Sequence, residues 1–116
     1  MFSNKNSKQK SEALRKILDR KGIISMPGCF DALSAKLIER EGIEVGFMSG
    51  FSVSSTKLGM PDTGLISFSE MLEQVKNISN ATSIPFIFDG DTGYGNSVNV
   101  YRTVRGYADA GAAGVM

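Results

Sequence analysis

The sequence predicts an α/β protein whose parallel sheet forms the first four units of an eight-stranded β/α (TIM) barrel. Short apolar runs, typical of buried strands, alternate with amphipathic segments of helical spacing along the 116 residues. Strands and helices that alternate in this way form parallel sheets with right-handed crossovers. Polar clusters follow three predicted strands, and barrel active sites collect at that end. Periodicity leaves a doubly wound open sheet as the alternative, although its G-x-G-x-x-G turn is missing.

Two helices and two strands are expected in the first half of the chain, after a flexible polar tail over residues 1–10. Apolar residues at helical spacing predict a helix over 11–21, and the apolar run 23–26 predicts a strand closed by a Pro-Gly turn. An aspartate can cap a helix over 31–41, and the run 45–48 predicts a second strand. The helix residues expected to face inward are Leu14, Ile17, Leu18, Leu33, Leu37 and Ile38.

The second half is expected to repeat this alternation after a long connection over 49–66 that is rich in Ser, Thr and Gly. Loops of that length inside a compact domain are usually functional. Ser67 and Glu70 form a capping box that predicts the start of a helix. A strand over 85–88, a helix over 97–110 and the start of a fourth strand follow. The residues expected to share one face of each helix are Met71, Val75 and Ile78, and Tyr101, Val104 and Ala108.

The composition excludes several classes of partner and site. Lysine and arginine number 13 against 12 acidic residues, and no basic run suggests a nucleic-acid partner. No segment has the length of a membrane span or the apolar region of a signal peptide, so no membrane partner is expected. The single cysteine, Cys29, excludes an internal disulfide and fits a cytoplasmic location. Without histidine, acid–base chemistry must use carboxylates, tyrosines, lysines, the thiol or metal-bound water.

The most informative cluster is the pair Asp89 and Asp91, which follows the predicted strand 85–88 and opens a glycine-rich loop. Residues two apart on a strand point to the same side, so both carboxylates could converge if the extended conformation persists. Two such charges repel unless a cation lies between them, and Mg2+ is a hard cation that prefers oxygen ligands. Spacing alone supports a turn or capping pair equally well.

The other candidate residues carry weaker signals. Ser49 and Gly50 follow a predicted strand and could present N–H groups to a carboxylate or phosphate, although Ser-Gly turns are common. Asp62 follows a proline in the long connection, where a turn residue is the simplest interpretation. Cys29 is expected to be a small buried group. A nucleophilic role would need a basic neighbour that lowers the pKa of the thiol, and the nearby sequence offers none. The tyrosines of the last helix, Tyr101 and Tyr107, are expected to pack.

Four motifs, in order, resemble those of the isocitrate lyase and phosphoenolpyruvate mutase superfamily. The segment 89–96 is similar to its D-x-D-T-G-Y-G-N signature. The segment 27–35 resembles P-G-x-x-D-A-L-S-A, 49–54 resembles S-G-x-S-V-S, and 59–62 resembles G-x-P-D. The similarity runs from about residue 11 to the last residue, and four ordered motifs are far more specific than any one alone.

The resemblance implies a β/α barrel with Mg2+-dependent chemistry on small 2-oxo or 2-hydroxy carboxylic acids. Asp89 and Asp91 would hold the metal, one of them through water. Asp62 would support the metal's water shell in a lyase, or handle the nucleophilic or phosphoryl step in a mutase. The residues that would bind a substrate carboxylate are Ser49, Gly50 and Phe51. Mg2+ would act as a Lewis acid on the oxygen of an enolate-like intermediate.

Within the superfamily, the stretch 61–65 resembles the P-D-x-G-L of 2-alkylmalate and methylisocitrate lyases more than the mutase pattern. The resemblance therefore favours a lyase that splits a substituted malate or methylisocitrate-like acid by a retro-aldol route. A phosphoenolpyruvate or phosphonopyruvate mutase or hydrolase, and a non-catalytic chain, remain the alternatives. Phe47 stands where lyases often carry Tyr and mutases Trp, so this position keeps an aromatic ring and lacks the hydroxyl.

The catalytic cysteine of the superfamily lies in a K-[KR]-C-G-H-like loop beyond the fourth strand, and this sequence does not contain it. Cys29 does not occupy that place. The expectation is that residues 11–116 form the N-terminal half of a barrel domain, truncated or split, which supplies the metal and carboxylate side of the site. The proton donor would come from elsewhere, and the chain alone would be inactive. The resemblance also implies a homo-oligomer when full length.

Overall fold

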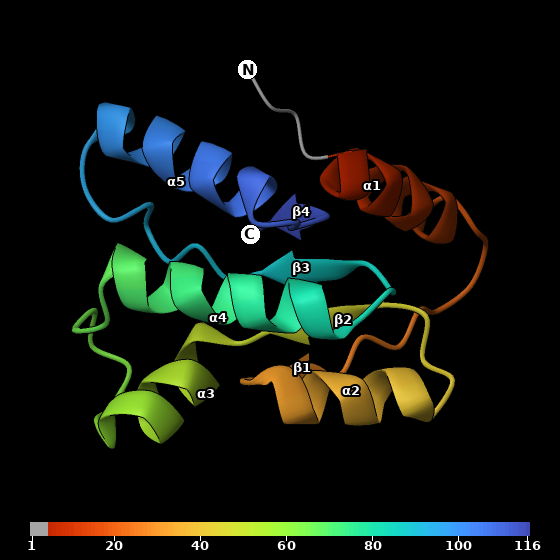
Figure 1. The fold of residues 1–116 in the computed structure, drawn as a ribbon, viewed down its shortest axis with the longest axis horizontal. Coiled ribbons are helices and arrows are strands. Elements are labelled where there is room, and N and C mark those ends of the chain that lie inside the picture. Colours follow the sequence, from red (N-terminus) through yellow and green to blue (C-terminus); the bar gives the residue numbers. More distant parts are fainter. Residues whose placement is uncertain (1–4) are drawn as a thin grey trace.

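The computed structural model describes residues 5–116, and its elements follow the predicted alternation of strands and helices (Figure 1). The strands are β1 (Gly28–Cys29), β2 (Gly46–Met48), β3 (Phe86–Phe88) and β4 (Gly114–Val115). The helices are α1 (Lys5–Leu18), α2 (Ala32–Arg40), α3 (Gly50–Val53), α4 (Phe68–Ala81) and α5 (Ser97–Asp109). A π-helical segment, η1 (Ser54–Leu58), continues directly from α3.

The four strands form one sheet in the order β1-β2-β3-β4, and each adjacent pair is parallel. In a β/α barrel successive strands lie side by side in chain order, whereas a doubly wound sheet reverses its order at a switch point. The observed order therefore confirms the barrel prediction. The register pairs Met48 with Cys29 on one side and with Phe88 on the other, so the strands end at a common edge.

The two faces of the sheet are covered differently. Phe86 and Phe88 lie in a core cluster with buried residues of α2, α4 and α5, and Figure 1 shows α4 lying across the sheet between α5 and α2. Ile87 points to the other face, because side chains alternate along a strand. There it packs beside a smaller cluster that includes Leu14 of α1 and Val45. The core between sheet and helices thus supports the ends of β2 and β3.

The first helix differs most from its prediction, because α1 begins at Lys5 instead of residue 11. Residues 5–10 are therefore helical and do not form the predicted tail, while residues 1–4 lie outside the described part of the chain. Contacts with distant segments explain the longer helix. Lys10 is buried, and its ammonium group donates to the carbonyl oxygens of Ser79 and Thr82, each at 2.9 Å.

Replacing Lys10 by methionine is expected to lower the free energy of unfolding by about 2 kcal/mol, the usual contribution of hydrogen bonds from a charged group. The ammonium binds carbonyls at the C-terminus of α4, which have no partners within the helix and carry the negative end of its dipole. Urea denaturation would measure the loss. The matched control is Lys8→Met, since Lys8 is exposed on the same helix. Equal effects of the two substitutions would contradict this role.

Two further predictions of position are wrong. The predicted strand 23–26 is not a strand; β1 lies at Gly28–Cys29, which pair with Phe47 and Met48 of β2. Ile23 is fully exposed instead of buried. The inward faces of two helices also differ: α2 buries Ala35, and α5 buries Thr103 and Tyr107. The large side chains that were expected inside and are exposed are Leu18, Leu33, Leu37, Tyr101 and Val104.

The starts of α2 and α4, by contrast, lie where the capping residues predict them. Asp31 caps α2 by accepting from the N–H of Ser34, and Ser67 and Glu70 form the predicted capping box at the start of α4. The connection 49–66 was expected to be a loop, yet it contains α3 and η1. No helix within residues 5–116 is both long and apolar enough to cross a membrane.

Candidate metal and substrate site

Asp89 comes directly after β3, at the carboxyl edge of the sheet, and its side chain is half-buried. Its N–H donates to the carbonyl of Met48 at 3.1 Å, so the link between β2 and β3 continues into this residue. Its Oδ2 accepts from the N–H of Gly50 at 3.0 Å, and its Oδ1 accepts from the N–H of Asp91 at 2.8 Å. Both carboxylate oxygens are thus oriented by amides, and each retains a lone pair for another partner.

Asp91 lies in a turn and not on an extension of the strand. Its φ of 51° is in the left-handed region, so the alternation that would place residues 89 and 91 on one side does not persist. The bond from the Asp91 N–H to the Asp89 side chain is that of an Asx turn. The turn interpretation of the pair is therefore confirmed. Asp91 itself is exposed, and its carboxylate is accessible to solvent.

The loop after Asp89 is held by hydrogen bonds from α5 that the sequence interpretation missed, although Tyr107 packs as predicted. Tyr107 Oη donates to the carbonyl of Asp89 at 3.1 Å, and Thr103 Oγ1 donates to the carbonyl of Gly93 at 2.9 Å. Tyr94, with a left-handed φ of 62°, places its hydroxyl 3.4 Å from that of Tyr107. A threonine and a tyrosine four residues apart on one helix face were the signal that could have indicated these contacts.

The predicted acidic residues all lie close enough to Tyr94 to act on its hydroxyl. Burial raises the pKa of Tyr94 to about 12, and the hydrogen bond with Tyr107 acts in the opposite direction. Nearby negative charges raise this pKa further, and they come from Asp91, Asp89 and Asp62. Burial likewise raises the pKa of Tyr107 far above its ordinary value. Both phenols therefore stay protonated at neutral pH and serve as neutral hydrogen-bonding groups.

The donor set at this edge fits a magnesium ion that retains much of its water. Within residues 5–116 no group of three or more His, Cys, Asp or Glu side chains could hold a metal ion. Mg2+ commonly binds through one or two carboxylates and completes its shell with water and substrate oxygens. Asp89 and Asp91 offer such carboxylates, and the lone pairs that remain on the oriented Asp89 oxygens are suitable ligands. The two residues therefore fit the ion chemically.

The predicted carboxylate-binding segment lies beside Asp89. Ser49 caps α3 through its Oγ, which accepts from the N–H of Ser52 at 3.3 Å. The N–H of Gly50 was expected to face the substrate, yet it donates to Asp89. Gly50 is also a site of close approach, since a Cβ added there would lie 2.6 Å from Asp89 Oδ2. Phe51 is 60% exposed and borders this edge of the sheet.

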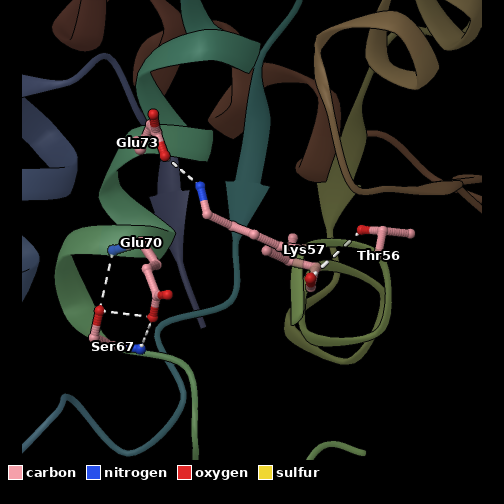
Figure 2. Close-up of polar contacts among 6 residues, drawn as sticks. Thr56, Lys57, Ser67, Glu70 and Glu73 are labelled. Atoms are coloured by element: carbon pink, nitrogen blue, oxygen red, sulfur yellow. Dashed lines mark hydrogen bonds and ion pairs between the residues drawn. The ribbon is translucent and has the colours of Figure 1, made fainter. Parts of the chain in front are cut away.

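Asp62 is exposed on the part of the long connection that follows η1. This part is anchored at both ends, as Figure 2 shows. Before it, the ammonium of Lys57 in η1 pairs with Glu73 of α4. After it, the Ser67 N–H donates to Glu70 Oε2 at 2.8 Å in the capping box of α4. Asp62 therefore sits on a short exposed segment attached to α4 on either side.

Cys29 is fully buried at the end of β1 and belongs to the main core cluster. Burial raises the pKa of its thiol to about 12, and the negative charge of Asp31 contributes to the increase. The nucleophile of a thiol enzyme is the thiolate, which is scarce at such a pKa. The prediction that Cys29 is a small packing residue is confirmed.

Comparison with known proteins identifies the family. A family model described as phosphoenolpyruvate phosphomutase matches residues 14–116. Over 100 residues the chain is 44% identical to carboxyvinyl-carboxyphosphonate phosphorylmutase of Arabidopsis thaliana, a match that covers 85% of this chain and 30% of that protein. It is also 44% identical over 100 residues to 2,3-dimethylmalate lyase of Eubacterium barkeri, which covers 86% of this chain and 35% of that protein.

The solved structure of phosphonopyruvate hydrolase in complex with oxalate and Mg2+ is similar, with a TM-score of 0.85 and 39% identity. That match covers 91% of this chain and 37% of the hydrolase chain. The chain spans about a third of the length of the curated relatives that it matches. The sheet order, the ordered motifs and these matches agree, and the chain belongs to the phosphoenolpyruvate mutase family, within the isocitrate lyase and phosphoenolpyruvate mutase superfamily of lyases and mutases.

Proposed function

We propose that this chain supplies the metal-binding and carboxylate-binding half of a Mg2+-dependent carbon–carbon lyase. The substrate would be a substituted malate or a methylisocitrate-like 2-hydroxy acid. The observation that carries the proposal is the half-buried Asp89 carboxylate at the carboxyl edge of the sheet. The N–H groups of Gly50 and Asp91 donate to its two oxygens and orient it. In a β/α barrel this edge faces the active site.

In this proposal the residues of the chain bind and orient. Asp89 and Asp91 would hold Mg2+, which when bound would stabilise negative charge that develops on substrate oxygens. Ser49 and Phe51 would border the substrate carboxylate, whereas Gly50 would act through Asp89. Asp62, on its exposed segment, would bind water near the metal. The cytoplasmic location and assembly into a homo-oligomer remain predictions.

The proposed reaction is a retro-aldol cleavage. A base takes the proton of the C2 hydroxyl, the C2–C3 bond breaks, and C2 becomes the carbonyl carbon of a 2-oxo acid. The electron pair of the broken bond passes to the departing carboxylic acid as an enolate, and a proton donor then delivers a proton to C3. The buried thiol of Cys29 is unsuited to be this donor. We place the donor in residues that would complete the barrel.

A mutase or hydrolase acting on a phosphonate is the second candidate. It is favoured by the 39% identity to phosphonopyruvate hydrolase and the 44% identity to a phosphorylmutase. The lyase is supported by equal identity to 2,3-dimethylmalate lyase and by the P-D-T-G-L stretch at 61–65. The two candidates share the metal residues and differ in the bond that is broken.

A substrate assay tests the proposal. The chain joined to residues that complete the barrel is expected, with Mg2+, to release a 2-oxo acid from 2,3-dimethylmalate or 2-methylisocitrate. The chain alone is expected to show negligible turnover, because its proton donor is missing. Turnover of phosphonopyruvate alone would overturn the lyase in favour of the second candidate. Turnover by the chain alone would show that the donor lies among its own residues.

A further inference from the structure

The buried face of α5 is formed by two residues that carry hydroxyl groups. Thr103 and Tyr107 are the buried residues of this helix, with exposed fractions of 3% and 0%. They are four residues apart and so lie on one side of the helix. A helix that only packed against a core would bury apolar side chains here, yet α5 leaves Val104 and Tyr101 exposed.

Each hydroxyl donates to a backbone carbonyl of the segment 89–95, which we call the metal loop. Tyr107 binds the carbonyl of Asp89 at 3.1 Å, and Thr103 binds the carbonyl of Gly93 at 2.9 Å. These carbonyls lie two residues before and two residues after Asp91. A buried hydroxyl without a partner costs free energy, so both side chains favour the loop conformation that brings the carbonyls to them.

The metal loop needs such support because its backbone is unusual. Asp91 and Tyr94 both have positive φ angles, which side chains other than glycine rarely adopt. The loop's own hydrogen bonds are few, and they include the bond from the Gly93 N–H to the Gly90 carbonyl at 2.9 Å. Strained backbone of this kind persists where surrounding contacts determine it.

We propose that Thr103 and Tyr107 are positioning residues that clamp the metal loop to α5 and so present Asp89 and Asp91 to a divalent cation. That the cation is Mg2+ rests on the proposed function. Tyr94 extends it, since its hydroxyl lies within reach of Tyr107 and its ring packs on Phe68 at the start of α4. Outer contacts of this type orient metal ligands.

Isosteric substitutions separate the hydroxyl contacts from packing. Tyr107→Phe keeps the ring that stacks against Phe68, and Thr103→Val keeps the shape of the side chain. Thr103→Ser retains the hydroxyl and should rescue the effect of the valine. Tyr101→Phe is the matched control, because Tyr101 lies on the exposed face of the same helix. Each variant would be titrated with MgCl2 while its amide NMR spectrum is recorded.

The expected result is a Kd for Mg2+ about 10-fold higher in Tyr107→Phe and in Thr103→Val, within the range for outer contacts of metal sites. Without metal, amide hydrogen exchange at Asp91 and Gly93 is expected to be about 10-fold faster or more. This increase corresponds to the loss of roughly one hydrogen bond that holds the loop closed. Exchange at Val75, buried in α4, reports global unfolding and is expected to change less. Thr103→Ser and Tyr101→Phe should behave as the unmodified chain.

The outcomes distinguish this clamp from the proposed function. If the unmodified chain binds Mg2+ and both variants match it in affinity and loop exchange, the clamp is overturned and the metal site stands. If exchange at Val75 rises as much as in the loop, the two residues are structural only, and the positioning role is again overturned. If the unmodified chain shows no Mg2+ shift, the metal assignment fails, while faster loop exchange in the variants would still support the clamp.

Discussion

An Asp89→Ala chain is expected to lose Mg2+ affinity by about 100-fold, the upper end of what loss of an outer partner costs at a metal site. Asp89 is the half-buried carboxylate of the proposed pair, and amides of Gly50 and Asp91 hold both of its oxygens. Removing it deletes one of the two proposed ligands and frees two N–H donors. In this variant Asp91 is the proposed ligand that remains, and because it is exposed on a turn it would bind a hydrated ion weakly. Isothermal calorimetry with MgCl2 measures the change.

Alanine is a better test at this position than asparagine. Both Asp89 oxygens accept from N–H groups, so the NH2 of an asparagine would face a donor at one of them. Asp19→Asn is a suitable control for net charge, because Asp19 is exposed just after α1. Thermal unfolding of each variant shows whether the fold is retained. An unchanged binding isotherm in a folded Asp89→Ala chain would remove the metal assignment.

The starts of α2 and α4 followed from the sequence because they depend on local chemistry. A side-chain oxygen that accepts from an N–H two or three residues later requires only nearby residues, and this is why Asp31 and Ser67 marked helix starts correctly. The alternation of apolar runs and helices similarly required a parallel sheet. The end of each strand then placed Ser49 and Asp89 at one edge.

The buried faces of the helices could not be predicted in the same way. Apolar spacing shows which side chains share a face, but burial depends on what lies opposite. On α2 the small Ala35 is buried, and the larger Leu33 and Leu37 are exposed. On α5 Thr103 and Tyr107 are buried, and Tyr101 is exposed. The hydroxyls of Thr103 and Tyr107 donate to backbone carbonyls, and a buried hydroxyl that donates a hydrogen bond loses little free energy.

Of the two interpretations of Asp89 and Asp91, the turn is the one observed, and the extended strand conformation is not. The spacing argument required an extended backbone, but the glycines around Asp91 favour a turn, and β3 ends at Phe88. The turn orients Asp89, because the N–H of Asp91 donates to the Asp89 side chain two residues earlier. The contact from Gly50 joins residues 39 positions apart, which no local pattern reveals.

Gly50→Ala is expected to lower Mg2+ affinity by between about 10-fold and 100-fold, although it removes no ligand. A Cβ at this position would lie 2.6 Å from Asp89 Oδ2 and 3.0 Å from its Cγ, closer than carbon and oxygen atoms pack. The carboxylate must therefore turn away, and the hydrogen bond from the Gly50 N–H is then lost. The free energy of unfolding should fall by about 1 kcal/mol, the usual contribution of the hydrogen bond that is lost, because a side chain and not the backbone moves.

Gly28→Ala provides a matched control for this prediction. Gly28 lies in β1, beside the strand β2 that precedes Gly50, and a Cβ there would meet nothing within 4 Å. It should leave both Mg2+ affinity and stability nearly unchanged. Calorimetry and urea denaturation of the two variants together test whether Gly50 is required by close approach to Asp89. A Gly50→Ala chain that binds Mg2+ as tightly as Gly28→Ala would show that the orientation of Asp89 does not govern the metal site, since the clash leaves this carboxylate no way to keep its place.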